Sequence, residues 1–139
     1  MKEKEHEALL KIARAAVENA YSVYSRFSVG AAILMENGEI VRGSNQENMA
    51  YPSGLCAERV ALFYACSAYP GVKVKAIAIA ARDAAGAWVE ALTPCGACRQ
   101  VMSEVIRRYQ ADFDVIVAGK KGEIVVVPAS ELLPAPFSL

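Results

Sequence analysis

The spacing of apolar and polar residues predicts three helices along the chain. Between Glu5 and Ala20 apolar residues recur every three or four positions, which indicates a helix with one buried face. A second helix is expected from Cys56 to Tyr69, where Pro70-Gly71 ends it, and a third from Cys95 to Tyr109. The residues expected on the inner faces of the second and third helices are Ala57, Val60, Ala61, Tyr64, Ala65, Val101, Val105 and Ile106.

Short apolar runs predict strands between these helices. The run from Ser28 to Met35 is followed by Asn37-Gly38, the strongest short hairpin signal, because both positions of such a turn need positive φ. The alternating stretch after this turn, Glu39–Ser44, is the expected return strand. Three further strands are expected: Val74–Ala81, covered on both faces, Asp114–Ala118 and Glu123–Val127.

The order of these elements predicts the fold class. Helix, hairpin, helix, strand, helix and two strands indicate an α/β protein with three layers, α/β/α, and a mixed sheet of about five strands. The chain has 139 residues, enough for one core, and neither a linker nor an internal repeat divides it, so we expect a single domain over residues 1–139. A short helix begins near Pro128, with Ser130 as its expected cap.

Charge and composition limit the classes of partner that the protein is expected to bind. The chain carries 15 Lys and Arg against 15 Asp and Glu, for a net charge of zero, and contains no block of basic residues. This balance disfavours a nucleic-acid polymer and favours a small ligand. No stretch has the length of a membrane span, and no apolar run of signal-peptide type follows the charged start, so we expect a cytoplasmic protein without a membrane partner.

Three of the four cysteines have the spacing of a metal site. Cys95 and Cys98 lie about one turn apart at a predicted helix start, and Cys56 begins another helix, where the helix dipole favours a thiolate. The only histidine, His6, lies near the N-terminus and is expected to be solvated, so a metal here must be held by sulfur. Three thiolates fill three positions of a tetrahedral Zn²⁺ and leave the fourth for water.

Two charged residues beside Cys56 fit a catalytic zinc better than a structural one. Glu58 lies close enough in sequence to act on a zinc-bound water. Arg59, three residues after Cys56 on the same helical face, is expected to donate hydrogen bonds to a thiolate, which draws charge from an electron-rich metal site. Arg99 is a second candidate for this role, and the alternative for both arginines is a surface ion pair.

Other interpretations of the cysteines remain open at this point. Cys95 and Cys98 also fit a redox dithiol with Cys56 as an ordinary buried cysteine, although that leaves Glu58 without a role. Cys66 lies almost three turns along the helix from Cys56, too far to share a tetrahedron, so we expect it in the core.

A few polar and aromatic residues outside these motifs are candidates for ligand binding. Asn45 and Glu47 would point the same way from an extended strand end, and an amide beside a carboxylate suits a sugar diol, although a polar turn explains them as well. Phe27 and Phe137 lie in irregular segments, where each either packs in the core or faces a planar ligand. Tyr24 and Tyr51 stay ambiguous.

Six motifs occur along the chain in this order: Tyr24-Ser25-Arg26-Phe27-Ser28-Val29-Gly30-Ala31-Ala32, Asn45-Gln46-Glu47-Asn48, Tyr51-Pro52, Cys56-Ala57-Glu58-Arg59, Pro94-Cys95-Gly96-Ala97-Cys98-Arg99-Gln100-Val101 and Glu131-Leu132-Leu133-Pro134. Together they resemble the motifs of the small zinc-dependent cytidine deaminases, and the likeness covers most of the chain. Two residues depart from the family pattern: Val23 stands where a proline is common, and Ser44 where a cysteine is common. Neither touches the proposed chemistry.

The resemblance implies a five-stranded sheet between helices, one Zn²⁺ per subunit and a homotetramer with active sites shared between subunits. It implies a small-molecule nucleoside substrate, cytidine or 2′-deoxycytidine, hydrolysed to the uridine form and ammonia in pyrimidine salvage. The implied roles are proton shuttle for Glu58, ribose binding for Asn45 and Glu47, packing near the base for Phe27, main-chain contact with the pyrimidine edge for Ala57, and reach into a neighbouring subunit's pocket for Phe137.

Three rival functions remain. One is a deaminase of another aminopyrimidine nucleoside, of the blasticidin S type. The second is a polynucleotide-editing deaminase, against which the neutral charge counts. The third is a non-catalytic zinc or redox module.

Overall fold

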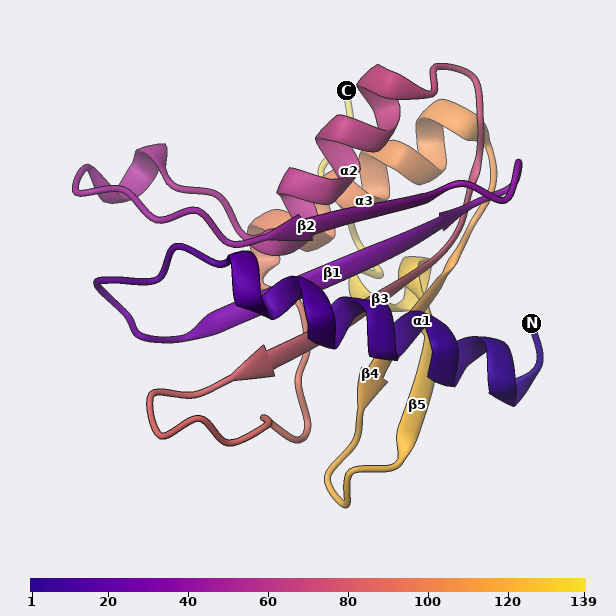
Figure 1. Cartoon of the computed structure of the whole chain (residues 1–139). Helices are drawn as coiled ribbons and strands as arrows, with labels where there is room; N and C mark the ends of the chain where they lie inside the picture. Colours follow the sequence, from indigo (N-terminus) through magenta and orange to yellow (C-terminus); the bar gives the residue numbers. More distant parts are fainter.

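The computed structural model describes residues 1–139 and contains one five-stranded mixed sheet between helices (Figure 1). The strand order is β2-β1-β3-β4-β5. Only β3 and β4 pair in parallel, and the other neighbours are antiparallel. The elements are α1 (Glu3–Ala16), η1 (Val17–Asn19), β1 (Ser28–Met35), β2 (Ile40–Ser44), η2 (Tyr51–Ser53), α2 (Ala57–Ala68), β3 (Val74–Arg82), α3 (Gly96–Tyr109), β4 (Asp114–Ala118), β5 (Ile124–Pro128) and η3 (Ala129–Leu132).

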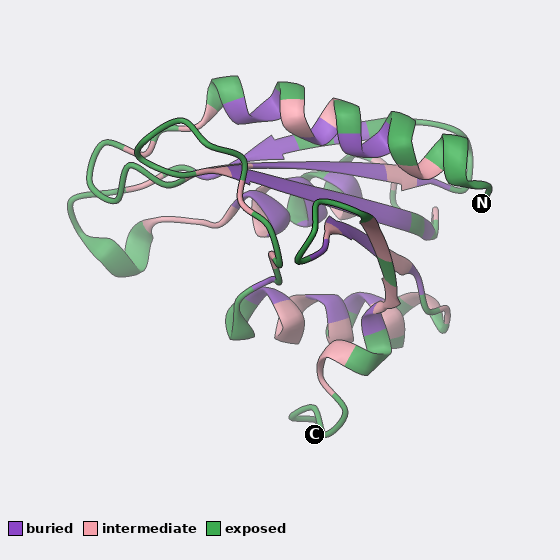
Figure 2. Ribbon diagram, turned by 90° about the horizontal axis from the view of Figure 1, so that it is seen from below, coloured by how far each residue is buried: buried purple, intermediate pink, exposed green.

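The helices lie on opposite faces of the sheet. Helix α1 runs across one face, while α2 and α3 lie together on the other (Figures 1 and 2). The larger core cluster, of 17 buried residues, fills the α2 and α3 side, and a smaller cluster of nine lies under α1. Strand β3 is buried along most of its length because helices cover both of its faces. The predicted three-layer fold with a mixed sheet of five strands is therefore confirmed.

Two glycines allow the helices to lie unusually close to the sheet. A Cβ at Gly43 of β2 would lie 2.6 Å from the carbonyl oxygen of Ala57, and one at Gly30 of β1 would lie 2.1 Å from that of Ala13. Any larger residue would push α2 or α1 outward. Gly43 thus brings the first turn of α2, and the cysteine that precedes it, against the sheet.

This close approach explains why the prediction for the inner face of α2 was partly wrong. Small side chains, Ala57, Ala61 and Ala65, meet the sheet, and Leu62 is fully buried beside them. Tyr64, expected inside, is 60% exposed. On α3, Val105 is buried as expected, while Met102 and Cys98 take the central inner positions.

Three local predictions also need correction. The Asn37-Gly38 hairpin forms, but only Gly38 has positive φ, because the turn is closed by a hydrogen bond from the Met35 N–H to the Glu39 carbonyl that spans an extra residue. Ser130 does not cap η3; its hydroxyl and N–H donate to Asp112 instead. His6 is half-buried rather than solvated, and its Nε2 has no partner.

None of the helices combines the length and the apolar character needed to cross a membrane.

Candidate active site

The three predicted cysteines meet where two helices begin. Cys56 is the N-cap residue of α2 and Cys95 that of α3, both with extended backbone, and Cys98 lies in the first turn of α3. The Sγ atoms of Cys56 and Cys95 are 3.6 Å apart, and those of Cys95 and Cys98 are 3.4 Å apart. All three sulfur atoms lie within 4.8 Å of one another, and none is in a disulfide.

This sulfur cluster fits a tetrahedral zinc. Four ligands about 2.3 Å from the metal lie about 3.8 Å from one another, close to the separations of these thiols. Cys66 takes no part in the cluster and packs against the larger core, as expected. No further Cys, His, Asp or Glu joins the three cysteines, which leaves a fourth position for water.

Arg59 lies against the cluster and supplies positive charge to it. Its Nη2 donates a hydrogen bond of 3.4 Å to the Cys56 sulfur, as the helical spacing predicts. The hydrogen bond with Cys98, together with that from Arg59, lowers the pKa of the Cys56 thiol to about 5. The same contact with Cys56 raises the pKa of the Cys98 thiol. A thiolate is therefore already favoured at Cys56, as a metal ligand requires.

Glu58 is a buried carboxylate that lies beside this cluster. It is 4% exposed, in the first turn of α2, and its side chain lines the cavity beside Cys56. Burial raises the pKa of Glu58, and negative charge at Cys56 raises it further. A carboxyl group with a raised pKa, held beside a metal site, is suited to accept and return a proton near neutral pH.

Arg99 does not serve the sulfur atoms. Its Nε donates to the carbonyl of Pro94 at 2.8 Å, and its Nη1 donates to that of Leu132 at 2.9 Å. Arg99 therefore ties the turn before Cys95 to the C-terminal segment. The alternative of a surface ion pair is also wrong for both arginines, because the only ion pair joins Arg82 to Glu18.

A cavity of about 650 Å³ opens beside the cysteines. Residues at and beside the sulfur cluster line part of it: Cys56, Glu58, Arg59 and Cys95. The other walls come from segments far apart in the sequence, and the remaining lining residues are Tyr24, Ser25, Phe27, Val29, Asn45, Gln46, Glu47, Asn48, Tyr51, Gly54, Leu55, Ile79, Leu92 and Thr93. Sequence reasoning missed the apolar walls from Val29, Leu55, Ile79 and Leu92. Val29 lies inside the Tyr24–Ala32 motif but has no chemical group that suggests a ligand role, and Leu55, Ile79 and Leu92 are ordinary apolar residues outside every motif.

Asn45 and Glu47 both line the cavity, and both hold the loop that enters β1. The Asn45 amide accepts from the Val29 N–H and donates to the Phe27 carbonyl, each at 2.9 Å. The Glu47 carboxylate accepts from the N–H groups of Tyr24 and Ser25, at 3.0 and 3.1 Å, and from the Ser25 hydroxyl. These two side chains are thus fixed in place before any ligand arrives.

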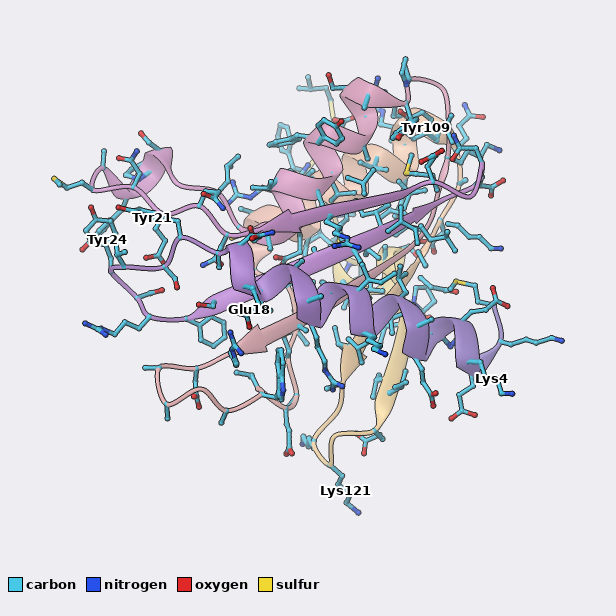
Figure 3. The ribbon with its side chains drawn as sticks, viewed as in Figure 1. Lys4, Glu18, Tyr21, Tyr24, Tyr109 and Lys121 are labelled. Carbon is cyan, nitrogen blue, oxygen red and sulfur yellow. The ribbon has the colours of Figure 1, made fainter.

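The aromatic candidates occupy different places. Phe27 lines the cavity, and the rings of Tyr24 and Tyr51 meet edge to face, 6.2 Å apart, at its outer side. Tyr24 lies in the loop before β1, at the end of the molecule away from the N-terminus (Figure 3). Phe137 is 72% exposed and lines no part of this cavity, and the Ala57 side chain is buried behind it.

Comparison with known proteins agrees with this geometry. The sequence model of the family described as "Cytidine and deoxycytidylate deaminase zinc-binding region" matches residues 3–110. The cytidine deaminase of Halalkalibacterium halodurans is 44% identical over 135 residues, which cover 96% of this chain and 95% of that protein. That of Sporosarcina psychrophila is 43% identical over 133 residues, covering 95% and 90%.

A solved structure extends the likeness to three dimensions. The cytidine deaminase of Burkholderia pseudomallei has a TM-score of 0.80 and 40% identity, with 95% of this chain and 98% of that chain covered. The matched range, residues 3–110, contains all three cysteines of the cluster and Glu58. The chain therefore belongs to the zinc-binding cytidine and deoxycytidylate deaminase family.

Proposed function

We propose that this protein catalyses the hydrolytic deamination of cytidine and 2′-deoxycytidine to uridine and 2′-deoxyuridine, with release of ammonia, as a cytoplasmic enzyme of pyrimidine salvage. The observation that carries the proposal is a buried carboxylate, Glu58, beside three clustered sulfur atoms at a cavity of about 650 Å³. Such a cavity falls within the range of small-molecule sites.

Cys56, Cys95 and Cys98 would hold one Zn²⁺ per subunit. When bound, zinc supplies an activated water at its open position. Arg59 withdraws charge from the Cys56 sulfur through its hydrogen bond, which makes the three-thiolate site less electron-rich.

Glu58 would move the protons of the reaction. Its carboxylate accepts a proton from the water that attacks C4 of cytosine and delivers it to N3. It then transfers the second proton of that water to the 4-amino group, which leaves as ammonia while the C4 carbonyl of uridine forms. One residue serves both transfers because its raised pKa keeps it effective as base and as acid.

The rest of the cavity would bind the nucleoside. Asn45 would contact the ribose through the amide N–H and lone pair left free by its bonds to Val29 and Phe27. The ionised Glu47 carboxylate would accept a hydrogen bond from a ribose hydroxyl at a position not taken by Tyr24 and Ser25. Phe27 would pack near the base, and the main chain of Ala57 would contact the pyrimidine edge. Phe27 has the exposed ring this role needs, at 37%.

The charges in the cavity favour a nucleoside over a nucleotide. Arg59 is the only Lys or Arg that lines it, and its guanidinium is engaged with Cys56. Glu47 and Glu58 are both acidic, so a 5′-phosphate would meet carboxylates with no free cation to pair with.

The test compares cytidine and cytidine 5′-monophosphate as substrates, with ammonia release as the measured quantity. With zinc-loaded protein, we expect deamination of cytidine and a kcat/KM for the nucleotide at least about 10²-fold lower, as like charges in a closed site predict. Equal rates would contradict the nucleoside assignment. No activity on either compound, with zinc present, would point to another aminopyrimidine substrate.

The exposed apolar surface supports assembly into a homotetramer with shared active sites. Tyr51, Phe63, Tyr64 and Phe137 are each at least half exposed, at 77%, 50%, 60% and 72%. Exposed apolar side chains of this size, on η2, α2 and the C-terminal tail, are candidates for subunit contacts. The side chain of Gln100 donates a hydrogen bond of 3.4 Å to the Phe137 carbonyl, and Phe137 does not line the cavity of its own chain.

A complementation experiment tests the sharing of sites. Phe137→Ala should raise KM for cytidine about tenfold, because a buried aromatic contact is lost. Co-assembly with inactive Glu58→Gln subunits should restore the low KM, since those subunits supply Phe137 to the sites that still have Glu58. A KM that stays high in the mixed assembly, or a monomeric mass in solution, would contradict shared sites.

A further inference from the structure

The hydroxyl group of Ser25 connects two residues of the cavity wall. It donates a hydrogen bond to Oε2 of Glu47, and it accepts one of 3.0 Å from the N–H of Phe27. Both partners line the cavity, one as a carboxylate and the other as an aromatic ring. The hydroxyl oxygen accepts the Phe27 N–H through a lone pair. Its one proton is therefore free to be donated to Glu47.

The main chain of Phe27 is held from both sides. Ser25 binds its N–H, and the Asn45 amide binds its carbonyl at 2.9 Å. Between Ser25 and Phe27, Arg26 has a φ of 57°, a backbone conformation that costs energy for a residue with a side chain. Local hydrogen bonds of this kind hold the turn in that conformation, and they set the direction in which the Phe27 ring enters the cavity.

Ser25 also determines how much of Glu47 is left for a ligand. A carboxylate has about four acceptor positions. Oε1 already accepts two main-chain N–H groups, and Oε2 accepts the Ser25 hydroxyl. One position on Oε2 remains. Although burial would raise the pKa of Glu47, the hydrogen bonds from Ser25 and Tyr24 lower it overall, so the carboxylate stays ionised.

We infer that Ser25 is a positioning residue for the nucleoside: it orients the free lone pair of Glu47 toward one sugar hydroxyl and, through the same hydroxyl group, places Phe27 against the base. This inference rests on the proposed function. It links the contact of Glu47 with the sugar to the contact of Phe27 with the base, so that a change at Ser25 weakens both.

The variants Ser25→Ala and Ser25→Thr test this role. Loss of the hydroxyl should raise KM for cytidine about tenfold, as expected for a lost hydrogen bond to a charged group, with kcat within about threefold of wild type. Ser25→Thr keeps a hydroxyl in the same position and should restore KM to within about threefold. Ser22→Ala is the matched control: its hydroxyl bonds Ser28 at 2.7 Å in the same loop and has no contact with Glu47.

A double-mutant cycle with Glu47→Gln separates positioning from general loosening of the loop. If Ser25 acts through Glu47, then Ser25→Ala should raise KM by a clearly smaller factor in the Glu47→Gln background than in wild type. The inference would be overturned if the two substitutions raised KM by factors that simply multiply, or if Ser25→Ala behaved like Ser22→Ala. Either result would leave the deaminase assignment intact. A zinc-loaded wild type that does not deaminate cytidine would overturn both.

Discussion

Replacing Glu58 by glutamine is expected to lower kcat for cytidine by about 10²–10⁴-fold, the range for loss of a positioned acid–base group. Glutamine has nearly the same shape but cannot accept or deliver a proton. The three sulfur atoms do not depend on this side chain, so zinc content should stay at the wild-type level. The measurement is ammonia release under saturating cytidine, with zinc quantified in the same samples.

Two acidic residues serve as controls for this substitution. Glu104→Gln on the exposed face of α3 should leave kcat unchanged. Glu47→Gln should act mainly on KM, because Glu47 is proposed to bind the sugar and its carboxylate contacts Tyr24 and Ser25 rather than the sulfur cluster. If Glu58→Gln kept more than about a tenth of wild-type kcat, the proton-shuttle role would be refuted.

The expected loss of activity in Glu58→Gln should not result from unfolding of the variant. Burial raises the pKa of Glu58, so the folded chain holds this proton more tightly than the unfolded chain does. A carboxyl of this kind favours folding at pH below its unfolded pKa, and this contribution is lost as the pH rises through the folded pKa. Glutamine cannot ionise, so metal-free Glu58→Gln at neutral pH should unfold at the wild-type temperature or above it.

Those parts of the site's centre that lie within one helix could be predicted from the sequence because their geometry is local, whereas the meeting of Cys56 with Cys95 depends on how α2 and α3 pack. A CxxC at a helix start places two sulfur atoms on one face, and Arg59 reaches Cys56 through ordinary helical spacing. These relations depend only on the helix, and the helix follows from the apolar pattern. The fold class followed in the same way from the order of the elements.

The rest of the site depends on tertiary contacts that no local pattern contains. Glu47 binds a loop more than 20 residues earlier in the chain, and Arg99 reaches the carbonyl of Leu132 rather than a thiolate. The exposure of Tyr64 likewise follows from the close packing of α2 on Gly43, where only alanines fit. Each of these features is set by which segments the sheet brings together.

Cys95→Ala is expected to lose zinc, activity and part of the folding stability together. The Cys95 sulfur lies 3.6 Å from that of Cys56 and 3.4 Å from that of Cys98, and its removal leaves two ligands, one at the start of α2 and one in α3. Two thiolates bind zinc far more weakly than three, and metal ligation contributes directly to the free energy of folding. The measurement is zinc content, cytidine turnover and unfolding temperature, all under reducing conditions.

Cys66→Ala makes the same change outside the cluster and provides the comparison. Because Cys66 packs against the core and is absent from the sulfur cluster, its variant should keep full zinc and turnover, with at most a small loss of stability. Chelation of the wild type should reproduce the Cys95→Ala result, and added zinc should reverse it only in the wild type. If Cys95→Ala retained both zinc and activity, the three-cysteine site would be refuted. If wild type were fully active after complete removal of metal, the catalytic role of zinc would be refuted as well, since Glu58 would then have to activate water alone.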